Sequence, residues 1–261
     1  MPYHQDGAVR YFTFDSLESG RVIHAAFTRL GGVSPRPWDS LNFGSTVGDE
    51  AKNVVVNRQR AFECMGLDYQ SSYDVWQVHG RDIAIADAPR PPEVKHQRAD
   101  IIVTDKPGVV LLMRFADCVP LLFYDPHHHI AGIAHAGWQG TVKRVASAAV
   151  EALHSRFQTD PQDLIAVIGP SIGPDHYQIG PDVANQVVSA FGQDASAVLI
   201  NEDGRISLDL WLANRIQLDR SGVKNIESTQ ICTACHLEDW YSHRGQHGRT
   251  GRVGVLIALR G

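Results

Sequence analysis

The stretch Ala116–Gly140, ADCVPLLFYDPHHHIAGIAHAGWQG, decides the fold that we expect for this chain. Two apolar runs, PLLFY beginning at Pro120 and IAGIA beginning at Ile130, flank the turn segment DPHHH. Apolar runs joined by a short turn predict an antiparallel hairpin. The residues just before the first strand and just after the second then lie side by side, so we expect Cys118 and His135 to face each other.

A facing thiol and imidazole allow two chemical interpretations. They can act as a nucleophile and its base, or they can be two ligands of a metal such as zinc. His79 adds a third group, because the segment Gln77-Val78-His79-Gly80 also follows an expected strand and ends in glycine. Three nitrogen and sulfur ligands leave a fourth position open, as in a catalytic zinc site. Separate core or loop roles for the three residues are the alternative.

Composition places the chain among ordinary globular proteins. It has 261 residues, of which 43% are hydrophobic, and a formal net charge of −5. The basic residues are scattered singly, which argues against a nucleic-acid partner. The N-terminal residues lack the apolar run of a signal peptide, and no stretch is long enough to span a membrane. We therefore expect a cytoplasmic protein with no membrane partner. A monomer is a separate expectation, which composition does not decide.

The rest of the chain predicts alternating strands and helices without a repeat or a linker. Motif-bearing strand ends occur in both halves, so one domain is the economical interpretation. Strands are expected at Arg21–Phe27, Tyr73–Val78, Arg81–Ala86 (pairing with the preceding strand), Ile101–Thr104, Val109–Phe115, Leu164–Ile168, Asn225–Gln230 and Val253–Leu259, and helices at Glu50–Met65, Gly140–Phe157, Asp182–Phe191 and Asp209–Leu218.

The helix expected after Gly140 begins immediately beyond His135. The positive end of a helix favours an anion or a thiolate nearby. Four arginines that lie in or beside Gly-rich or polar segments are further candidates for anion binding: Arg29, Arg58, Arg244 and Arg252. Two or more of them converging would bind phosphate in a bidentate manner. Solvated surface arginines are the alternative.

Two other motifs carry less chemistry. Cys232-Thr-Ala-Cys235-His236 has the spacing of a c-type haem attachment site, or of one half of a zinc site. Haem attachment takes place outside the cytosol, and the second half of a zinc site could only come from distant histidines. We expect a turn with reduced thiols. The run His127–His129 sits at the expected hairpin tip and is interpreted as a surface loop.

Several motifs together resemble one protein family over nearly the whole chain. The chain resembles the laccase-domain family, also named polyphenol oxidase, whose members are described as purine nucleoside phosphorylases with adenosine deaminase activity and, in some bacteria, as peptidoglycan editing factors. The matching residues are Phe27-Thr28-Arg29 with Gly31-Gly32-Val33-Ser34, Val47-Gly48-Asp49, Asn57-Arg58, Gln77-Val78-His79-Gly80, Ala116-Asp117-Cys118 with Pro120, His135-Ala136-Gly137-Trp138 with Gly140, Ile168-Gly169-Pro170-Ser171-Ile172, Cys232-Thr233, and Ser242 with Arg244 before Gly251-Arg252. Cys235-His236 and the histidine-rich segment Ser242–Arg252 depart from the pattern.

The resemblance implies a single α+β domain over residues 1–261, with mixed β-sheets flanked by helices in a four-layer α/β/β/α sandwich. It implies zinc bound by His79, Cys118 and His135, which would also be the catalytic residues. The implied reaction is phosphate-dependent cleavage of adenosine, inosine, guanosine or methylthioadenosine to base and ribose 1-phosphate, with deamination of adenosine at the same site.

The partners are then a purine nucleoside and phosphate. Arg58 and Arg244 are assigned to phosphate, with Arg29 and Arg252 as further candidates for the substrate-binding set. Gln77 is assigned to orientation of the site, and Asp117 to support of the turn before Cys118.

Two alternatives use the same residues differently. The older family name implies copper and phenol oxidation. Multicopper oxidases use many histidines, arranged largely as His-x-His pairs, and here the only such pair lies inside His127–His129. The other alternative is a cysteine hydrolase that edits a peptidoglycan precursor, with Cys118 as nucleophile and His135 as its base.

Overall fold

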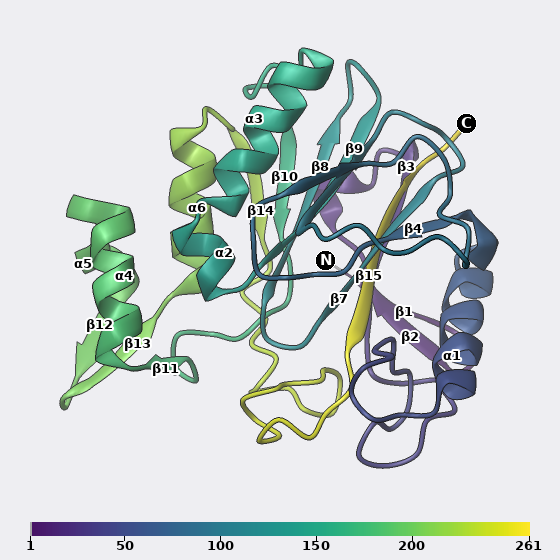
Figure 1. The fold of residues 1–261 in the computed structure, drawn as a ribbon, viewed down its shortest axis with the longest axis horizontal. Coiled ribbons are helices and arrows are strands. Elements are labelled where there is room, and N and C mark those ends of the chain that lie inside the picture. The colour runs from purple at the N-terminus through teal and green to yellow at the C-terminus, as the bar shows by residue number, and fades with distance from the viewer. Residues whose placement is uncertain (1) are drawn as a thin grey trace.

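The computed structural model describes residues 2–261 and shows two six-stranded sheets packed face to face, with helices on both outer faces. This is the α/β/β/α sandwich expected from the resemblance, in a single α+β domain (Figure 1). Helix α1 (Ala51–Cys64) covers one sheet, whereas α3 (Val145–Phe157) and α6 (Leu210–Arg220) cover the other. Among the described residues, no helix is long and apolar enough to cross a membrane.

The first sheet contains both ends of the chain. Its strand order is β1-β2-β3-β15-β7-β4, in which only the β4–β7 pair is parallel. The strands are β1 (Tyr3–Asp6), β2 (Val9–Phe12), β3 (Val22–Phe27), β15 (Val253–Leu259), β7 (Val110–Phe115) and β4 (Ser72–Asp74). Short 3-10 turns at Asp15–Leu17 and Tyr69–Ser71 connect parts of this half.

The second sheet is built on the hairpin. Its order is β14-β10-β8-β9-β6-β5, with parallel pairs only at the two edges, β14–β10 and β6–β5. The strands are β14 (Asn225–Ser228), β10 (Ile165–Ile168), β8 (Val119–Asp125), β9 (Ile130–Ala136), β6 (Ile101–Thr104) and β5 (Ile83–Ile85). The predicted hairpin is confirmed, and its register places Pro120 opposite His135.

A smaller sheet forms an extension beside α6. It has the order β11-β13-β12, from β11 (Gln178–Ile179), β12 (Leu199–Glu202) and β13 (Arg205–Leu208). Helices α4 (Pro181–Phe191) and α5 (Ala195–Val198), joined by a 3-10 turn at Gly192–Asp194, pack on it (Figure 1).

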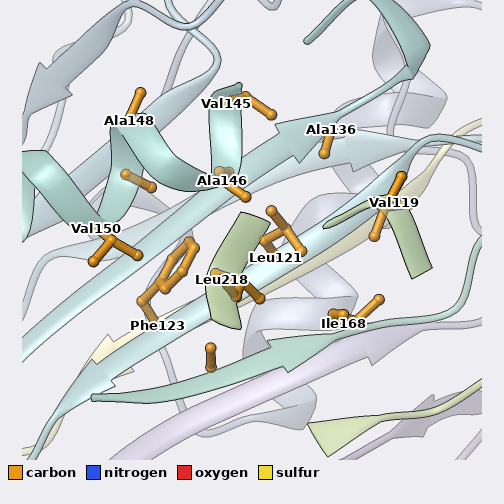
Figure 2. Packing of buried hydrophobic residues seen from close by; sticks show 14 of the residues in the cluster. Val119, Leu121, Phe123, Ala136, Val145, Ala146, Ala148, Val150, Ile168 and Leu218 are labelled. Carbon is orange, nitrogen blue, oxygen red and sulfur yellow. The ribbon is translucent and has the colours of Figure 1, made fainter. Parts of the chain in front are cut away.

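Side chains of β8 alternate between two buried faces, which explains why the sequence of this strand is apolar from Val119 to Tyr124. Val119, Leu121 and Phe123 point toward α3 and α6, as Figure 2 shows. Leu122 and Tyr124 belong instead to the cluster between the two sheets. A strand buried on both faces needs apolar residues at every position. Both β8 and β9 are therefore central strands.

Two expectations about connections are wrong. The helix expected from Gly140 to Phe157 is two helices, α2 (Trp138–Val142) and α3, separated by Arg144 at φ 64°. Gln217 of α6 donates a hydrogen bond to the Thr141 carbonyl at 2.6 Å. This contact holds α2 against α6 while α3 turns onto the sheet.

The expected pairing of Tyr73–Val78 with Arg81–Ala86 is also wrong. β4 ends at Asp74 and lies in the first sheet, whereas β5 lies in the second. The intervening segment, which carries His79, therefore passes from one sheet to the other. Local alternation predicts a strand but not its partner, which long-range contacts decide.

Candidate active site

Three side chains from separate elements meet at one end of the interface between the sheets. His79 comes from the segment that crosses between the sheets, Cys118 from the turn between β7 and β8, and His135 from β9. The Cys118 Sγ atom lies 4.0 Å from Nε2 of His79. One nitrogen of each histidine and this sulfur lie within 4.8 Å of one another. The structure thus brings together the three residues that the sequence predicted to converge.

Asp100 holds two of these residues in place. Its buried carboxylate accepts hydrogen bonds from the backbone N–H groups of His79, at 3.0 Å, and Gly80, at 2.7 Å. It also pairs with Nδ1 of His135 at 2.8 Å, so the other ring nitrogen, Nε2, is left for Cys118 or a metal. Sequence analysis missed Asp100, whose only signal is an acidic residue directly before the buried strand β6.

The electrostatics of the group favour charge separation. Burial alone would raise the pKa of Cys118, but the charge and hydrogen bonds of His135 and His79 lower it to about 6. Burial would lower the pKa of His135, yet Cys118 and Asp100 raise it to about 9. Burial would raise the pKa of Asp100, but the His135 contact and the backbone hydrogen bonds from Gly80 and Val78 together lower it. Both shifts in the Cys118–His135 pair favour a thiolate beside an imidazolium when no metal is bound.

Gly137 allows the close approach of these residues. A Cβ atom at this position would lie 2.8 Å from Sγ of Cys118 and 3.1 Å from Cδ2 of His79. Gly137 is also the N-cap of α2, so a helix does begin beside His135. It begins at Trp138, however, and has only five residues. The positive end that we expected from a long helix is therefore reduced to one short turn.

A cleft of about 510 Å³ opens over the three residues. Its size falls in the range typical of small-molecule sites. The walls combine aromatic rings with basic side chains. The lining residues are Gly44, Ser45, Thr46, Trp76, Gln77, His79, His96, Arg114, Ala116, Asp117, Cys118, His135, Trp138, Tyr177, His243, Arg244 and Arg252.

Two arginines of the cleft have no carboxylate partner. Arg244 donates to the carbonyl of Gln178 at 2.8 Å and lies over the ring of Tyr177. Arg252 donates to the carbonyl of Gly251 at 2.8 Å, and burial lowers its pKa. Neither forms an ion pair within residues 2–261. Both guanidinium groups therefore remain suited to an anion from solution.

The third cleft arginine, Arg114, is paired with a carboxylate inside the protein. Its Nη1 atom lies 2.7 Å from the buried carboxylate of Asp74. Arg90 and His96 contact the same carboxylate at 2.8 Å and 3.0 Å. These basic neighbours lower the pKa of Asp74 despite its burial. Sequence analysis missed this cluster, because its members come from distant parts of the chain.

Arg29 and Arg58 do not line the cleft. Arg29 donates to the carbonyls of Asp39 and Leu237, at 2.8 Å and 2.9 Å. Arg58 donates to the Phe43 carbonyl at 2.7 Å. Both side chains are largely buried, and buried guanidinium donors must find partners within the fold. They hold loops together. A sequence motif alone cannot show whether an arginine has this structural role or binds substrate.

Gln77 and Asp117 reach the cleft with their polar groups already bonded. The Gln77 amide donates to the Arg114 carbonyl at 2.9 Å and accepts from the Arg114 N–H at 3.0 Å. Asp117 adopts φ 84° and accepts from the Thr233 hydroxyl and the Arg244 N–H, at 2.8 Å and 2.6 Å. Asp117 therefore contacts the segments that carry Thr233 and Arg244, whereas Gln77 bonds the backbone of Arg114 and not a ligand residue.

The histidine run at the hairpin tip lies far from the cleft in the fold. His127 and His128 are exposed, and His128 contacts Asp125 at 2.9 Å. The two groups of potential metal ligands found in residues 2–261 do not include this run.

Comparisons with known proteins agree on one family. The model of the family described as multi-copper polyphenol oxidoreductase laccase matches residues 23–260. A purine nucleoside phosphorylase of Deinococcus radiodurans is 37% identical over 238 residues, covering 91% of this chain and 89% of the relative. The purine nucleoside phosphorylase YfiH of Escherichia coli is 34% identical, covering 91% of this chain and 94% of the relative.

A solved structure shows the same fold. The crystal structure of YlmD from Geobacillus stearothermophilus superposes with a TM-score of 0.92 at 32% identity and covers 99% of both chains. The purine nucleoside phosphorylase YlmD of the same organism is 35% identical over 242 residues, covering 89% of this chain and 88% of the relative.

Proposed function

Because this chain belongs to the multi-copper polyphenol oxidoreductase laccase family, several of whose curated members are named purine nucleoside phosphorylases, we propose that its cleft is the site of a zinc-dependent purine nucleoside phosphorylase. One observation carries the proposal. Three metal-ligand side chains lie at the base of a cleft whose wall presents two arginines without carboxylate partners.

The donor set fits zinc. Two imidazoles and a thiolate are ligands that zinc prefers, and three protein ligands leave one position for water or substrate. Nε2 of His79 lies near Sγ of Cys118, and the Asp100 contact leaves Nε2 of His135 free. Zinc bound by these three residues would supply a Lewis acid next to the bound substrate. The cleft surrounding it would take adenosine, inosine, guanosine or methylthioadenosine.

The remaining cleft residues divide between the two substrates. Arg244 and Arg252 provide guanidinium groups that bind phosphate in a bidentate manner and hold it for attack at C1′ of the ribose. Trp76, which is 50% exposed, and Tyr177 provide flat apolar surfaces for a purine ring. Arg29 and Arg58, expected from sequence to bind phosphate, take part only by supporting the surrounding loops.

Deamination of adenosine at the same site is part of the proposal. Both reactions need the same base and ribose contacts, whereas only phosphorolysis needs the anion held by the arginines. An assay with adenosine that follows inosine, adenine and ribose 1-phosphate, with and without phosphate, separates the two activities. We expect adenine and ribose 1-phosphate to require phosphate, and inosine to form without it.

Replacing Cys118 tests the role of the three ligands. Cys118→Ala should lower both activities by more than about 100-fold, because losing a ligand harms a metal site more than losing an outer-shell partner, which costs 10–100-fold. Zinc content should fall in parallel, as measured by inductively coupled plasma mass spectrometry. Cys64→Ser, which changes a half-buried thiol at the end of α1, is the matched control and should retain both. Full phosphorolysis by Cys118→Ala would exclude the proposed role.

A cysteine hydrolase acting on a peptidoglycan precursor is the second candidate. The observation that favours it is that Cys118 Sγ lies within 4.8 Å of a ring nitrogen of His135, whose Nδ1 pairs with Asp100, which is the arrangement of a nucleophile, a base and an orienting carboxylate. His79 distinguishes the candidates, because only the zinc site needs it as a ligand. His79→Gln should abolish zinc binding at the cleft and phosphorolysis. A thiol-directed reagent should label Cys118 only after chelation, if the thiolate is normally bound to metal.

Copper-dependent phenol oxidation is less well supported. The cleft contains four histidines, of which two belong to the ligand group. Multicopper chemistry needs several copper ions, each with its own histidine ligands. Stoichiometric copper and a blue absorption band in a metal-repleted sample would favour this function instead.

A further inference from the structure

A second group of metal-ligand side chains lies outside the set that holds the cleft metal. Asp175 and His176 lie on the loop that follows β10, and Cys232 and Cys235 lie on the segment that follows β14. All four ligand atoms lie within 4.8 Å of one another. Because β10 and β14 are parallel neighbours, both loops leave the same end of the sheet. The fold thus supplies the distant half-site that the Cys-x-x-Cys spacing lacks on its own.

The distances within this group match a tetrahedral zinc site. Zn–S bonds of about 2.3 Å and Zn–N or Zn–O bonds of about 2.0–2.1 Å give S···N and S···O edges of about 3.6 Å. Nδ1 of His176 lies 3.7 Å from Sγ of Cys232 and 3.5 Å from Sγ of Cys235. Sγ of Cys235 lies 3.4 Å from Oδ2 of Asp175. The direct contact between His176 and Asp175, at 2.9 Å, departs most, since the N···O edge is about 3.3 Å.

The surroundings hold the ligands independently of any metal. The Gly173 N–H donates to Sγ of Cys232 at 3.2 Å. A Cβ atom at Gly173 would lie 2.5 Å from Oδ1 of Asp175 and 3.2 Å from Cβ of Cys232, so a larger residue there would displace the Asp175 side chain. Ser171 and Cys232 also pair as neighbouring backbone segments. Such fixed ligand positions reduce the cost of ordering the site when a metal binds.

We propose that Asp175, His176, Cys232 and Cys235 bind a structural zinc ion that joins the loop after β10 to the loop after β14. Four protein ligands close the coordination shell, which is the arrangement of a structural site and not of a catalytic one. This zinc is distinct from the one assigned to His79, Cys118 and His135. Its presence does not depend on which reaction the cleft performs.

The position of the site gives it a consequence for the cleft. Tyr177, next to His176, lines the cleft, and Arg244 donates to the carbonyl of His176 at 3.4 Å. On the other loop, Thr233 donates to Asp117, the residue before Cys118. Zinc held between the loops therefore fixes the wall that carries Tyr177 and Arg244. Its ligands act as positioning residues and do not touch the substrate.

Metal content of the full-length protein tests the proposal. Both proteins are purified under reducing conditions and saturated with zinc. The variant that combines Cys232→Ser and Cys235→Ser should then contain about one zinc per chain fewer than the wild-type protein. Cys118→Ser should lose the other zinc, and Cys64→Ser should lose neither. Equal zinc content in the wild-type protein and the Cys232/Cys235 variant would overturn the proposal.

Cobalt provides a second readout that identifies the ligands. In Cys118→Ser, the thiol of the cleft site is gone, so any thiolate-to-cobalt charge-transfer band must come from Cys232 and Cys235. We expect this band, together with the visible bands of tetrahedral cobalt, and their loss on adding Cys235→Ser. Absence of the band in Cys118→Ser would contradict the proposal.

Alkylation of the wild-type protein keeps the test independent of how the variants fold. Cys235 is exposed, so iodoacetamide can reach its free thiol. Bound zinc should protect it, and chelation should restore the reaction, as read by peptide mass spectrometry. Equal labelling before and after chelation, or a Cys232–Cys235 disulfide in protein kept with reductant, would show that the thiols do not bind metal.

Discussion

Asp100 is the single residue on which the geometry of the cleft ligands depends most. It fixes the backbone of His79 and the ring of His135 with one carboxylate. Asp100→Asn keeps the shape but replaces one acceptor oxygen with a donor. We expect zinc affinity of the cleft site to fall by about 10–100-fold, which is the usual cost of losing such a partner.

A competition titration with a chromophoric chelator measures this change. Asp105→Asn, at an exposed carboxylate just beyond β6, is the matched control and should leave affinity unchanged. Wild-type affinity in Asp100→Asn would show that the backbone alone positions the two histidines.

His24 predicts how stability depends on pH. It is buried on β3, where Nε2 accepts the Phe14 N–H at 3.0 Å, and burial lowers its pKa to about 4 from an ordinary value of 6.5. As pH falls below 6.5, the unfolded chain binds the proton first, so stability is lost between pH 6.5 and about 4. His24 alone should lower the free energy of unfolding by about 2 kcal/mol between pH 7.5 and pH 5.

Urea unfolding at several pH values isolates this contribution. His24→Gln retains a polar side chain that does not titrate, so its stability should fall less steeply with acid than that of the wild type. Parallel curves for the two proteins would mean that His24 is protonated without cost in the fold.

At the scale of single residues, the sequence identified chemically active side chains better than it predicted which of them line the cleft. Cys118 and His135 were predictable because a hairpin fixes their proximity locally. Arg29 and Arg58 were not, since the partners that bind them, such as the Leu237 carbonyl, are distant in sequence. The cluster around Cys235 was not predicted for the same reason, because its other ligands come from the loop after β10.

The turn from β9 into α2 is the element that sets the size of the ligand group. Gly137 lies there because any side chain would occupy the space beside Cys118 and His79. Gly137→Ala should displace Sγ of Cys118 and reduce zinc affinity of the cleft site by at least about 10-fold, since ligand geometry controls affinity. The protein should still fold, because the change adds only one methyl group, which meets the side chains of the cleft residues Cys118 and His79.

Zinc titration of Gly137→Ala, with circular dichroism to confirm folding, provides the measurement. Gly180→Ala is the matched control, because Gly180 is also the N-cap of a helix but a Cβ there would meet nothing within 4 Å. Unchanged affinity in Gly137→Ala would indicate that the three ligands need less space than the structure implies.

Elements were predictable where their pattern is local. The hairpin and α1 follow from apolar runs and helical periodicity in one stretch of sequence. The break between α2 and α3 was not predictable, because it depends on the contact of Thr141 with Gln217 on α6. The separation of β4 from β5 likewise depends on which sheet offers each strand a partner.

On the scale of the whole molecule, the cleft is a product of the two-sheet architecture. Cys118 lies in the turn between β7 of the first sheet and β8 of the second, and the ring of His135 lies 5.5 Å from that of Phe115 on β7. The segment with His79 also crosses between the sheets. The overall sandwich was expected only from the family resemblance, because local sequence patterns do not predict how two sheets pack. The ligand group therefore exists only when both sheets have packed.

The most direct test of the account is a phosphorus nuclear magnetic resonance time course with inosine, inorganic phosphate and the zinc-loaded protein. The account predicts that the signal of ribose 1-phosphate grows as that of phosphate declines, and that Cys118→Ala gives no such signal while Cys64→Ser matches the wild type. Persistence of the phosphate signal with fully zinc-loaded wild-type protein, across adenosine, inosine, guanosine and methylthioadenosine, would contradict it.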